Sequence, residues 1–261
     1  MNRGILPSLV AAALLLAGCL GGDDSGSVKG TDADVALLMM GNSHTSSNNL
    51  PGMLEAMVAS ARAGETVDAV EAPGWMFLDE RYHHGPSLAL LQGQDWSFVI
   101  LQAQKYSSTG CCFYSTEEAK ALVRIARQQN AVPIMFPEWP RLGVDETMRI
   151  YDLHVSIAQA EPACVAPIGQ AWDLSLQRHP EIVLHASDGN HSAPAGAFLT
   201  ALVLFATVTG VSPLDAPVLG GFGVSAGTQS LLRAVAADTV AAWPPRQWCP
   251  DDPYPPPPGD A

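Results

Sequence analysis

Positive charge is scarce in this chain of 261 residues, where 13 lysines and arginines stand against 26 aspartates and glutamates. The net charge of −13 at neutral pH would repel phosphate-rich polymers and anionic headgroups. We therefore expect neither nucleic acid nor an anionic lipid surface as a partner. Charged residues make up 15% of the chain and hydrophobic residues 48%, a balance that is typical of a globular protein.

The apolar stretch at the start of the chain lacks the length to cross a bilayer as a stable helix. It runs from Ile5 to Leu16 and follows the positively charged start Met1-Asn2-Arg3, so it predicts a signal peptide over residues 1–18. The segment Leu16-Ala17-Gly18-Cys19 resembles the lipobox of bacterial lipoproteins, which implies that Cys19 is acylated and becomes the new N-terminus. Several acyl chains on one residue make a stable membrane anchor. A plain secretory signal with an incidental cysteine is the alternative.

The composition at both ends predicts segments outside the folded domain. Residues 19–33 contain a Gly, Asp and Ser stretch that would act as a flexible tether behind the lipidated cysteine. Residues 246–261 are rich in proline and predict an extended, unpacked tail. The 34–245 segment between them is of ordinary length for one α/β domain. Leu20 follows the cysteine, which favours the outer membrane of the cell envelope if the source is Gram-negative.

Cysteine is also infrequent, with five residues in all. Apart from Cys19, four remain, an even number that permits two disulfides in an oxidising compartment. Neighbours in sequence rarely bond to each other, so we expect Cys111 and Cys112 to reach distant partners, with Cys164 and Cys249 in those roles. No second closely spaced Cys or His pair has the spacing of a zinc site, so no metal is expected.

Apolar runs alternate with helical patterns along the middle of the chain. Strands are expected at Val35–Met40, Phe98–Leu101 and Val132–Phe136, and helices at Leu50–Ala63, Thr116–Gln129, Thr147–Ala160, Ala197–Val208 and Ala226–Ala242. This alternation is typical of β-α-β units with a parallel sheet. The sequence therefore predicts a doubly wound α/β domain.

Two separated segments suggest a serine hydrolase. Ser43 lies in Gly41-Asn42-Ser43-His44-Thr45, directly after the first predicted strand, where nucleophiles of open α/β sheets usually lie. Near the other end of the domain, Asp188 precedes His191 by three residues, so one turn could hold the imidazole by a hydrogen bond from its ring to the carboxylate. A serine after a glycine is, taken alone, more often turn chemistry.

Four short blocks give the chain a resemblance to the SGNH, or GDSL-like, hydrolase superfamily and its bacterial branch with a G-N-S-x-T block. They are Gly41–Thr45, Ala72–Trp75, Gln102–Gln104 and Asp188–His191, and the likeness spans residues 34–215. The resemblance implies a three-layer α/β/α sandwich with a mainly parallel, flavodoxin-like central sheet. It also implies an ester hydrolase that needs no cofactor.

The resemblance implies a role for each block. Ser43 would be the nucleophile, His191 the general base and acid, and Asp188 the group that orients the imidazole. The oxyanion would be bound by the amides of Ser43 and Gly74 and by a side-chain amide. Gln104 stands where relatives carry asparagine and is expected to supply that amide, with Gln102 as the alternative donor.

The expected substrate is a small ester, or an acyl group on a glycan or lipid. Two other functions fit the same fold: a non-catalytic envelope-binding lipoprotein and an O-acyltransferase. Glu138 is a second candidate for the carboxylate partner of His191.

Overall fold

The computed structural model describes Met1 and residues 31–250. The predicted signal peptide, Cys19 and most of the tether lie outside the described residues, as do residues 251–261. The centre of the domain is a parallel sheet of five strands in the order β2-β1-β3-β4-β5. The strands are β1 (Val35–Met40), β2 (Val67–Glu71), β3 (Phe98–Gln102), β4 (Val132–Phe136) and β5 (Cys164–Val165). This is the flavodoxin-like order, so the predicted fold is confirmed.

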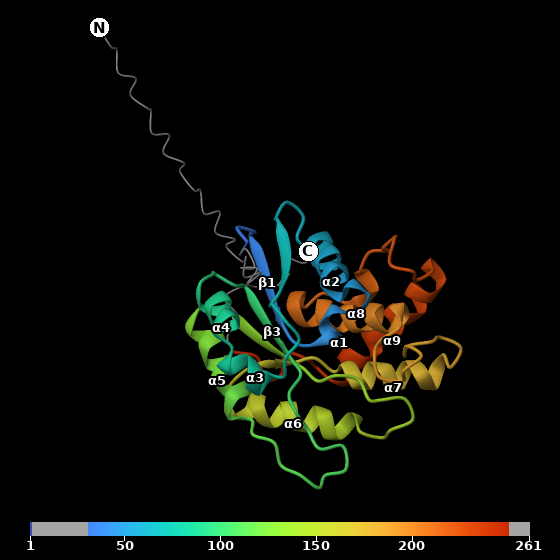
Figure 1. Ribbon diagram of the computed structural model, residues 1–261. Coiled ribbons are helices and arrows are strands. Elements are labelled where there is room, and N and C mark those ends of the chain that lie inside the picture. The colour runs from blue at the N-terminus through green and yellow to red at the C-terminus, as the bar shows by residue number, and fades with distance from the viewer. Residues whose placement is uncertain (2–30, 251–261) are drawn as a thin grey trace.

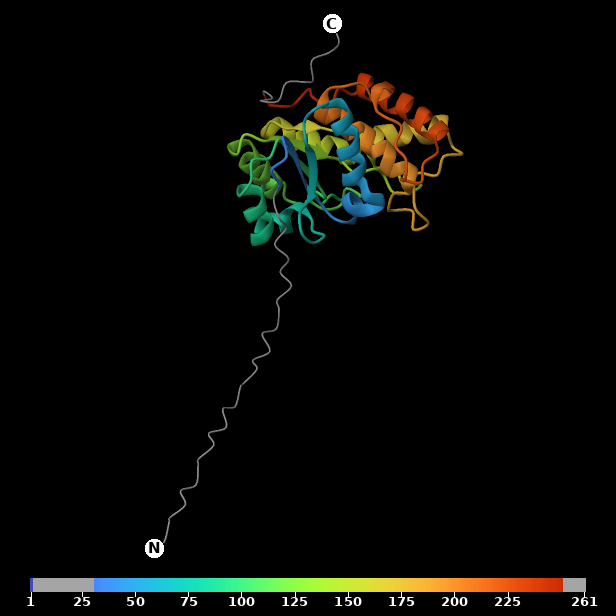
Figure 2. The same ribbon diagram turned by 90° about the horizontal axis from the view of Figure 1, so that it is seen from above.

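Helices cover both faces of the sheet, which gives the three layers visible in Figure 1 and Figure 2. One layer consists of α2 (Leu50–Ala61), α7 (Ile168–Arg178), α8 (Pro194–Thr209) and α9 (Ala226–Ala242). The other consists of α3 (Leu78–His83), α4 (Gly85–Gln92), α5 (Glu117–Gln128) and α6 (Thr147–Ala160). Three short pieces complete the described elements: α1 (Ser43–Ser46), η1 (Ser47–Asn49) and η2 (Pro213–Asp215).

Strand β1 shows why the sheet is buried on both sides. Leu37 and Met39 belong to the core under α2 and α8, whereas Leu38 and Met40 belong to the core under α4 and α5. Alternate side chains of a strand point to opposite faces, so an uninterrupted apolar run is what a strand with helices on both sides requires. The continuous hydrophobic sequence of β1 thus encodes its central position.

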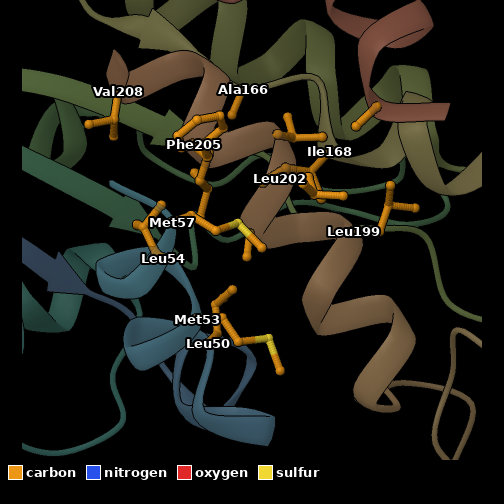
Figure 3. Close-up of a cluster of buried hydrophobic side chains, with 14 of the residues drawn as sticks. Leu50, Met53, Leu54, Met57, Ala166, Ile168, Leu199, Leu202, Phe205 and Val208 are labelled. Carbon is orange, nitrogen blue, oxygen red and sulfur yellow. The ribbon is translucent and has the colours of Figure 1, made fainter. Parts of the chain in front are cut away.

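Helix α8 is buried almost all round, as its apolar sequence predicts. In Figure 3, Phe205 lies beside Met57 of α2, and Leu199, Leu202 and Met53 belong to the same buried cluster. Each such side chain contributes about 1.5–3 kcal/mol when it is fully removed from water. This contact fixes the loop before α8 relative to the loop after β1. Within residues 31–250, no helix is both long enough and apolar enough to cross a membrane.

The disulfide pairing differs from the prediction. Cys111 bonds to its neighbour Cys112, and Cys164 bonds to Cys249. Cys164 and Cys249 are brought together because the chain near Pro245 runs alongside β5. Cys164 begins this strand, and the amide of Val165 donates a hydrogen bond to the carbonyl of Pro245. The adjacent pair lies in the exposed loop between β3 and α5, away from both other cysteines.

The folded domain extends beyond the predicted boundary at residue 245. Arg246 donates hydrogen bonds to the carbonyls of Thr207 and Val208 at the end of α8, and Trp248 packs against the core. Residues 246–250 are therefore part of the domain and not of the predicted tail. Cys249 links the same segment covalently to β5.

The Cys164–Cys249 bond should contribute strongly to stability because it closes a long loop, with a sequence separation of 85. We expect the double change Cys164→Ala and Cys249→Ala to lower the free energy of unfolding by about 2–4 kcal/mol in a urea titration. The matched control is Cys111→Ala with Cys112→Ala, since a bond between neighbours removes little entropy from the unfolded chain. Equal losses in the two double variants would contradict this account.

Candidate active site

The loop after β1 holds Ser43 at the start of α1. Asn42 caps this short helix, because its side-chain oxygen accepts a hydrogen bond from the amide of His44 at 3.0 Å. Gln102, at the end of β3, accepts hydrogen bonds from the Asn42 amide at 2.8 Å and from the Thr45 hydroxyl at 3.1 Å. A Cβ atom at Gly41 would collide with Thr45 and Gln102, so only glycine fits. These contacts explain the G-N-S-x-T pattern.

The loop before α8 brings Asp188 and His191 to the same end of the sheet. The amide of Ala186 donates to the carbonyl of His191 at 2.8 Å, and Gly189 has a φ of 70°, which favours glycine. One oxygen of Asp188 accepts hydrogen bonds from the amides of Asn190 and His191, each at 2.9 Å. The carboxylate is therefore held by its own turn.

The three predicted side chains form one hydrogen-bonded row. The hydroxyl of Ser43 lies 2.8 Å from Nε2 of His191, and Nδ1 of the same ring lies 2.5 Å from Asp188. A tautomer with its proton on Nδ1 donates to Asp188 and leaves Nε2 free to accept from the Ser43 hydroxyl. The structure thus brings together residues that are separated by almost 150 positions in the sequence.

The environment of Asp188 keeps it ionised. The hydrogen bond from the His191 ring, followed by the amide hydrogen bonds of Asn190 and His191, holds the pKa of Asp188 well below its usual range. An ionised carboxylate at this position stabilises an imidazolium at His191. Both side chains remain open to solvent, with exposed fractions of 34% for His191 and 50% for Asp188.

Two main-chain amides are available as oxyanion donors. Ser43 is the first residue of α1, so its amide has no acceptor within the helix. The amide of Gly74 donates no hydrogen bond to any atom of the described residues, and its φ of 74° again favours glycine. A role of these two amides in binding an oxyanion stays a prediction.

The side chain of Gln104 is not brought into this site, contrary to the prediction. Its amide nitrogen donates to the carbonyls of Lys105 at 2.9 Å and Ser115 at 3.0 Å. The long glutamine stem lets the amide fold back onto the main chain of its own loop. The alternative donor, Gln102, is fully buried and does not line the cavity beside Ser43, and its amide nitrogen donates one hydrogen to Glu138 at 2.9 Å.

Glu138 pairs with a second histidine instead of His191. Its carboxylate lies 3.3 Å from Nδ1 of His44, whose ring stacks on Trp139 with centroids 4.8 Å apart. The other nitrogen of His44 lies 3.1 Å from the side chain of Asn190. His44 and Trp139 therefore pack against the loop that carries Asp188. The carboxylate that binds the His191 ring is Asp188.

Arg81 is a residue that sequence reasoning missed. It is completely buried and donates hydrogen bonds to the carbonyls of Gly41, Pro73 and Gly74. Burial lowers the pKa of Arg81 to about 10, so the guanidinium is still charged at neutral pH. It ties the loop that carries Ser43 to the loop that carries Gly74. Arginine is mostly exposed in proteins, and nothing in the local sequence marks this one as buried.

A cavity of about 520 Å³ opens beside Ser43 and His191. Its other walls include Phe77, Lys105, Tyr106, Tyr114 and Arg141. A hollow with aromatic walls and a few polar groups is the usual form of a small-molecule site. Among the residues that the structure describes, no group of His, Cys, Asp and Glu side chains is arranged to hold a metal ion.

Comparison by sequence finds neither a matching family model nor a matching curated protein. Solved structures do match. A candidate SGNH hydrolase from Slackia heliotrinireducens is 24% identical, with a TM-score of 0.53 over 66% of this chain and 97% of its own. A DUF4886 family protein from Bacteroides uniformis is 16% identical, with a TM-score of 0.60 over 80% and 95% of the two chains.

An acetyl xylan esterase from Geobacillus stearothermophilus is 12% identical and has a TM-score of 0.52, over 75% of this chain and all of its own. At such low identities the likeness establishes the fold, and function has to be argued from the site. The chain has the fold of SGNH hydrolases, as the four sequence blocks predict.

Replacement of Arg81 by lysine should destabilise the domain although the charge is kept. Lysine offers one nitrogen in place of a planar fork, so it cannot reach the carbonyls of both loops, and each carbonyl left unpaired costs about 1–3 kcal/mol. We expect Arg81→Lys to lower the free energy of unfolding by about 2–4 kcal/mol. Arg127→Lys, on the exposed side of α5, should change it by less than about 0.5 kcal/mol. Similar values for both variants would exclude a clamping role for Arg81.

Proposed function

We propose that the protein is a serine esterase that removes acyl groups from oxygen, with Ser43, His191 and Asp188 as its triad. The observation that carries the proposal is the row of hydrogen bonds from Ser43 through His191 to Asp188, at the edge of a cavity. A serine hydroxyl is a poor nucleophile unless a base lies within hydrogen-bond reach. The distance of 2.8 Å between Ser43 and His191 meets that requirement.

The reaction has two acyl-transfer steps. His191 accepts the proton of Ser43 while the hydroxyl oxygen bonds to the carbonyl carbon, and it then returns the proton to the departing alcohol. Water next attacks the acyl-serine, with His191 as the base, and releases the carboxylic acid while Ser43 regains its proton. Asp188 stabilises the imidazolium in both steps.

The negative oxygen of each tetrahedral intermediate would be bound by the amides of Ser43 and Gly74. Loss of one such donor typically raises the barrier by about 3 kcal/mol. In this proposal the site works with main-chain donors, because the Gln104 amide donates to two other carbonyls and Gln102 is buried outside the cavity. Arg81 has a positioning role, since it binds one carbonyl in each of the two loops that carry these donors.

We further propose an O-acylated carbohydrate as the substrate. A neighbour with the same fold is, by its name, an acetyl xylan esterase. The aromatic walls of Phe77, Tyr106 and Tyr114 offer flat apolar surfaces of the kind that sugar rings stack on. The solvent exposure of His191 favours water over a second sugar as the acyl acceptor, so hydrolysis is preferred to acyl transfer.

The triad can be tested with an aryl acetate. We expect Ser43→Ala and His191→Ala each to lower kcat by about 10³-fold or more, and Asp188→Asn to lower it by about 10³–10⁴-fold because the imidazole loses its partner. Ser156→Ala, an exposed serine on α6, is the matched control and should behave as the wild type. If the wild-type protein is no faster than Ser43→Ala, the esterase proposal fails.

We propose that the enzyme is anchored in the bacterial cell envelope through acylated Cys19, on the extracytoplasmic side. The supporting feature is the lipobox-like segment Leu16–Cys19 behind a short apolar run. In cells fed with labelled palmitate, we expect label and membrane association in the wild type and neither in Cys19→Ala. Cys111→Ala with Cys112→Ala is the control and should keep both. A wild type without label would refute the anchor.

A further inference from the structure

A second, smaller cavity adjoins the one beside Ser43. Its volume is about 220 Å³, and Lys105, Tyr106 and Tyr114 line both cavities. Because the two share three wall residues, they lie side by side. The second cavity is large enough for one six-membered ring and a small substituent.

The loop from β3 to α5 forms one wall of this second cavity. The loop is green in Figure 1 and passes beside α6, where Arg149 donates a hydrogen bond to the carbonyl of Ser107 at 3.4 Å. Cys112 and Phe113 line the cavity, and the side chain of Phe113 is 88% exposed. A large aromatic ring left in water at the edge of a cavity is a surface on which a ring-shaped ligand can stack.

The Cys111–Cys112 disulfide restricts the conformation of this loop. It links two neighbours, so it contributes little to the stability of the whole domain, yet it restricts the main chain directly before Phe113. The hydroxyl of Ser107 accepts a hydrogen bond from the amide of Cys112 at 3.3 Å and closes the same turn. A wall that is ordered before binding loses less entropy when the ligand arrives.

Arg149 supplies a positive charge that no carboxylate neutralises. It lines the second cavity and forms no ion pair with any acidic residue of the described part of the chain. By contrast, Arg124, Arg141 and Arg178 each pair with a carboxylate. Lys105 also lines the cavity, but its ammonium group is bound by Asp79 at 2.7 Å and Glu80 at 3.3 Å. Carboxylates outnumber cations two to one in this sequence, yet the hydrogen bond of the Arg149 guanidinium goes to a main-chain carbonyl and leaves its charge without a carboxylate partner among residues 31–250.

We propose that the second cavity binds a ring that carries a carboxylate, namely a sugar acid joined to the acylated unit whose ester lies at Ser43. The planar fork of Arg149 would bind the carboxylate through two parallel hydrogen bonds, and Phe113 and Tyr114 would contact the face of the ring. This assignment of substrate class rests on the proposed esterase function. The net charge of −13 does not oppose it, because repulsion between exposed charges is screened beyond about 8 Å at physiological salt.

The proposal can be tested by binding, without hydrolysis. Calorimetry on the purified full-length protein would compare digalacturonate, the neutral disaccharide digalactose with the same linkage, and 4-hydroxybenzoate as an aromatic ring with a carboxylate. We expect digalacturonate to bind at least tenfold more tightly than either of the other probes. Arg149→Gln should remove the preference for the acidic disaccharide, and Arg149→Lys should keep only part of it.

Arg127→Gln is the matched control, because it removes the same charge from an exposed position that lines neither cavity. It should retain the wild-type preference, and Cys111→Ala with Cys112→Ala should weaken the binding of digalacturonate. Equal binding of the acidic and neutral disaccharides, or an unchanged preference in Arg149→Gln, would overturn the proposal. Tighter binding of 4-hydroxybenzoate would overturn the assignment to a sugar.

The two proposals fail in different experiments. Hydrolysis of an aryl acetate tests the triad alone, since that ester is too small to reach the second cavity. Binding of unacylated digalacturonate tests the second cavity alone, since no bond is broken.

Discussion

The buried guanidinium of Arg81 is the interaction on which the geometry of the site depends. Removal of a full charge from water costs several kcal/mol, so it is tolerated only where donors and acceptors match closely. Here main-chain carbonyls take the place of water, and those of Gly41 and Gly74 belong to the two loops that carry the proposed oxyanion donors. A shift of either loop would leave part of the buried cation without an acceptor. The same energetic penalty therefore restrains both loops at once.

The other half of the site depends on packing between distant segments. Helix α8 lies against α2 along an apolar seam, and the loop before α8 thereby reaches the loop after β1. Polar contacts then set the final position: the side chain of Asn48 donates to the carbonyl of Ser192 at 2.7 Å, and the indole of Trp139 donates to the carbonyl of Asn190 at 2.9 Å. His191 is thus held by elements from three parts of the chain. This arrangement lies at the carboxyl ends of the strands, where the strand order reverses between β1 and β3.

The elements that the sequence predicts well are those with an uninterrupted apolar signal. Strands Val35–Met40 and Val132–Phe136 have the expected bounds, because both are buried on two faces and need hydrophobic residues throughout. Strand β2, Val67–Glu71, is not predicted, since it lies at the edge of the sheet and Asp68 and Glu71 interrupt its apolar residues. Strand β5 has only two residues and pairs with β4 alone. So short a signal cannot be distinguished from a loop.

For the site, a feature could be predicted from the sequence when it depends on residues that are neighbours in the chain, and could not when it depends on contacts between distant segments. Ser43 and the pair of Asp188 and His191 lie in short blocks, each of which forms its own turn, so local sequence was enough to identify them as candidates. The disulfide partners, the buried position of Arg81 and the inward fold of the Gln104 amide depend on which segments meet in space. A sequence specifies such contacts between distant segments only through the packing of the whole domain. The sequence by itself therefore determined the fold class and the reactive groups, and the tertiary structure alone decided which side chains surround them.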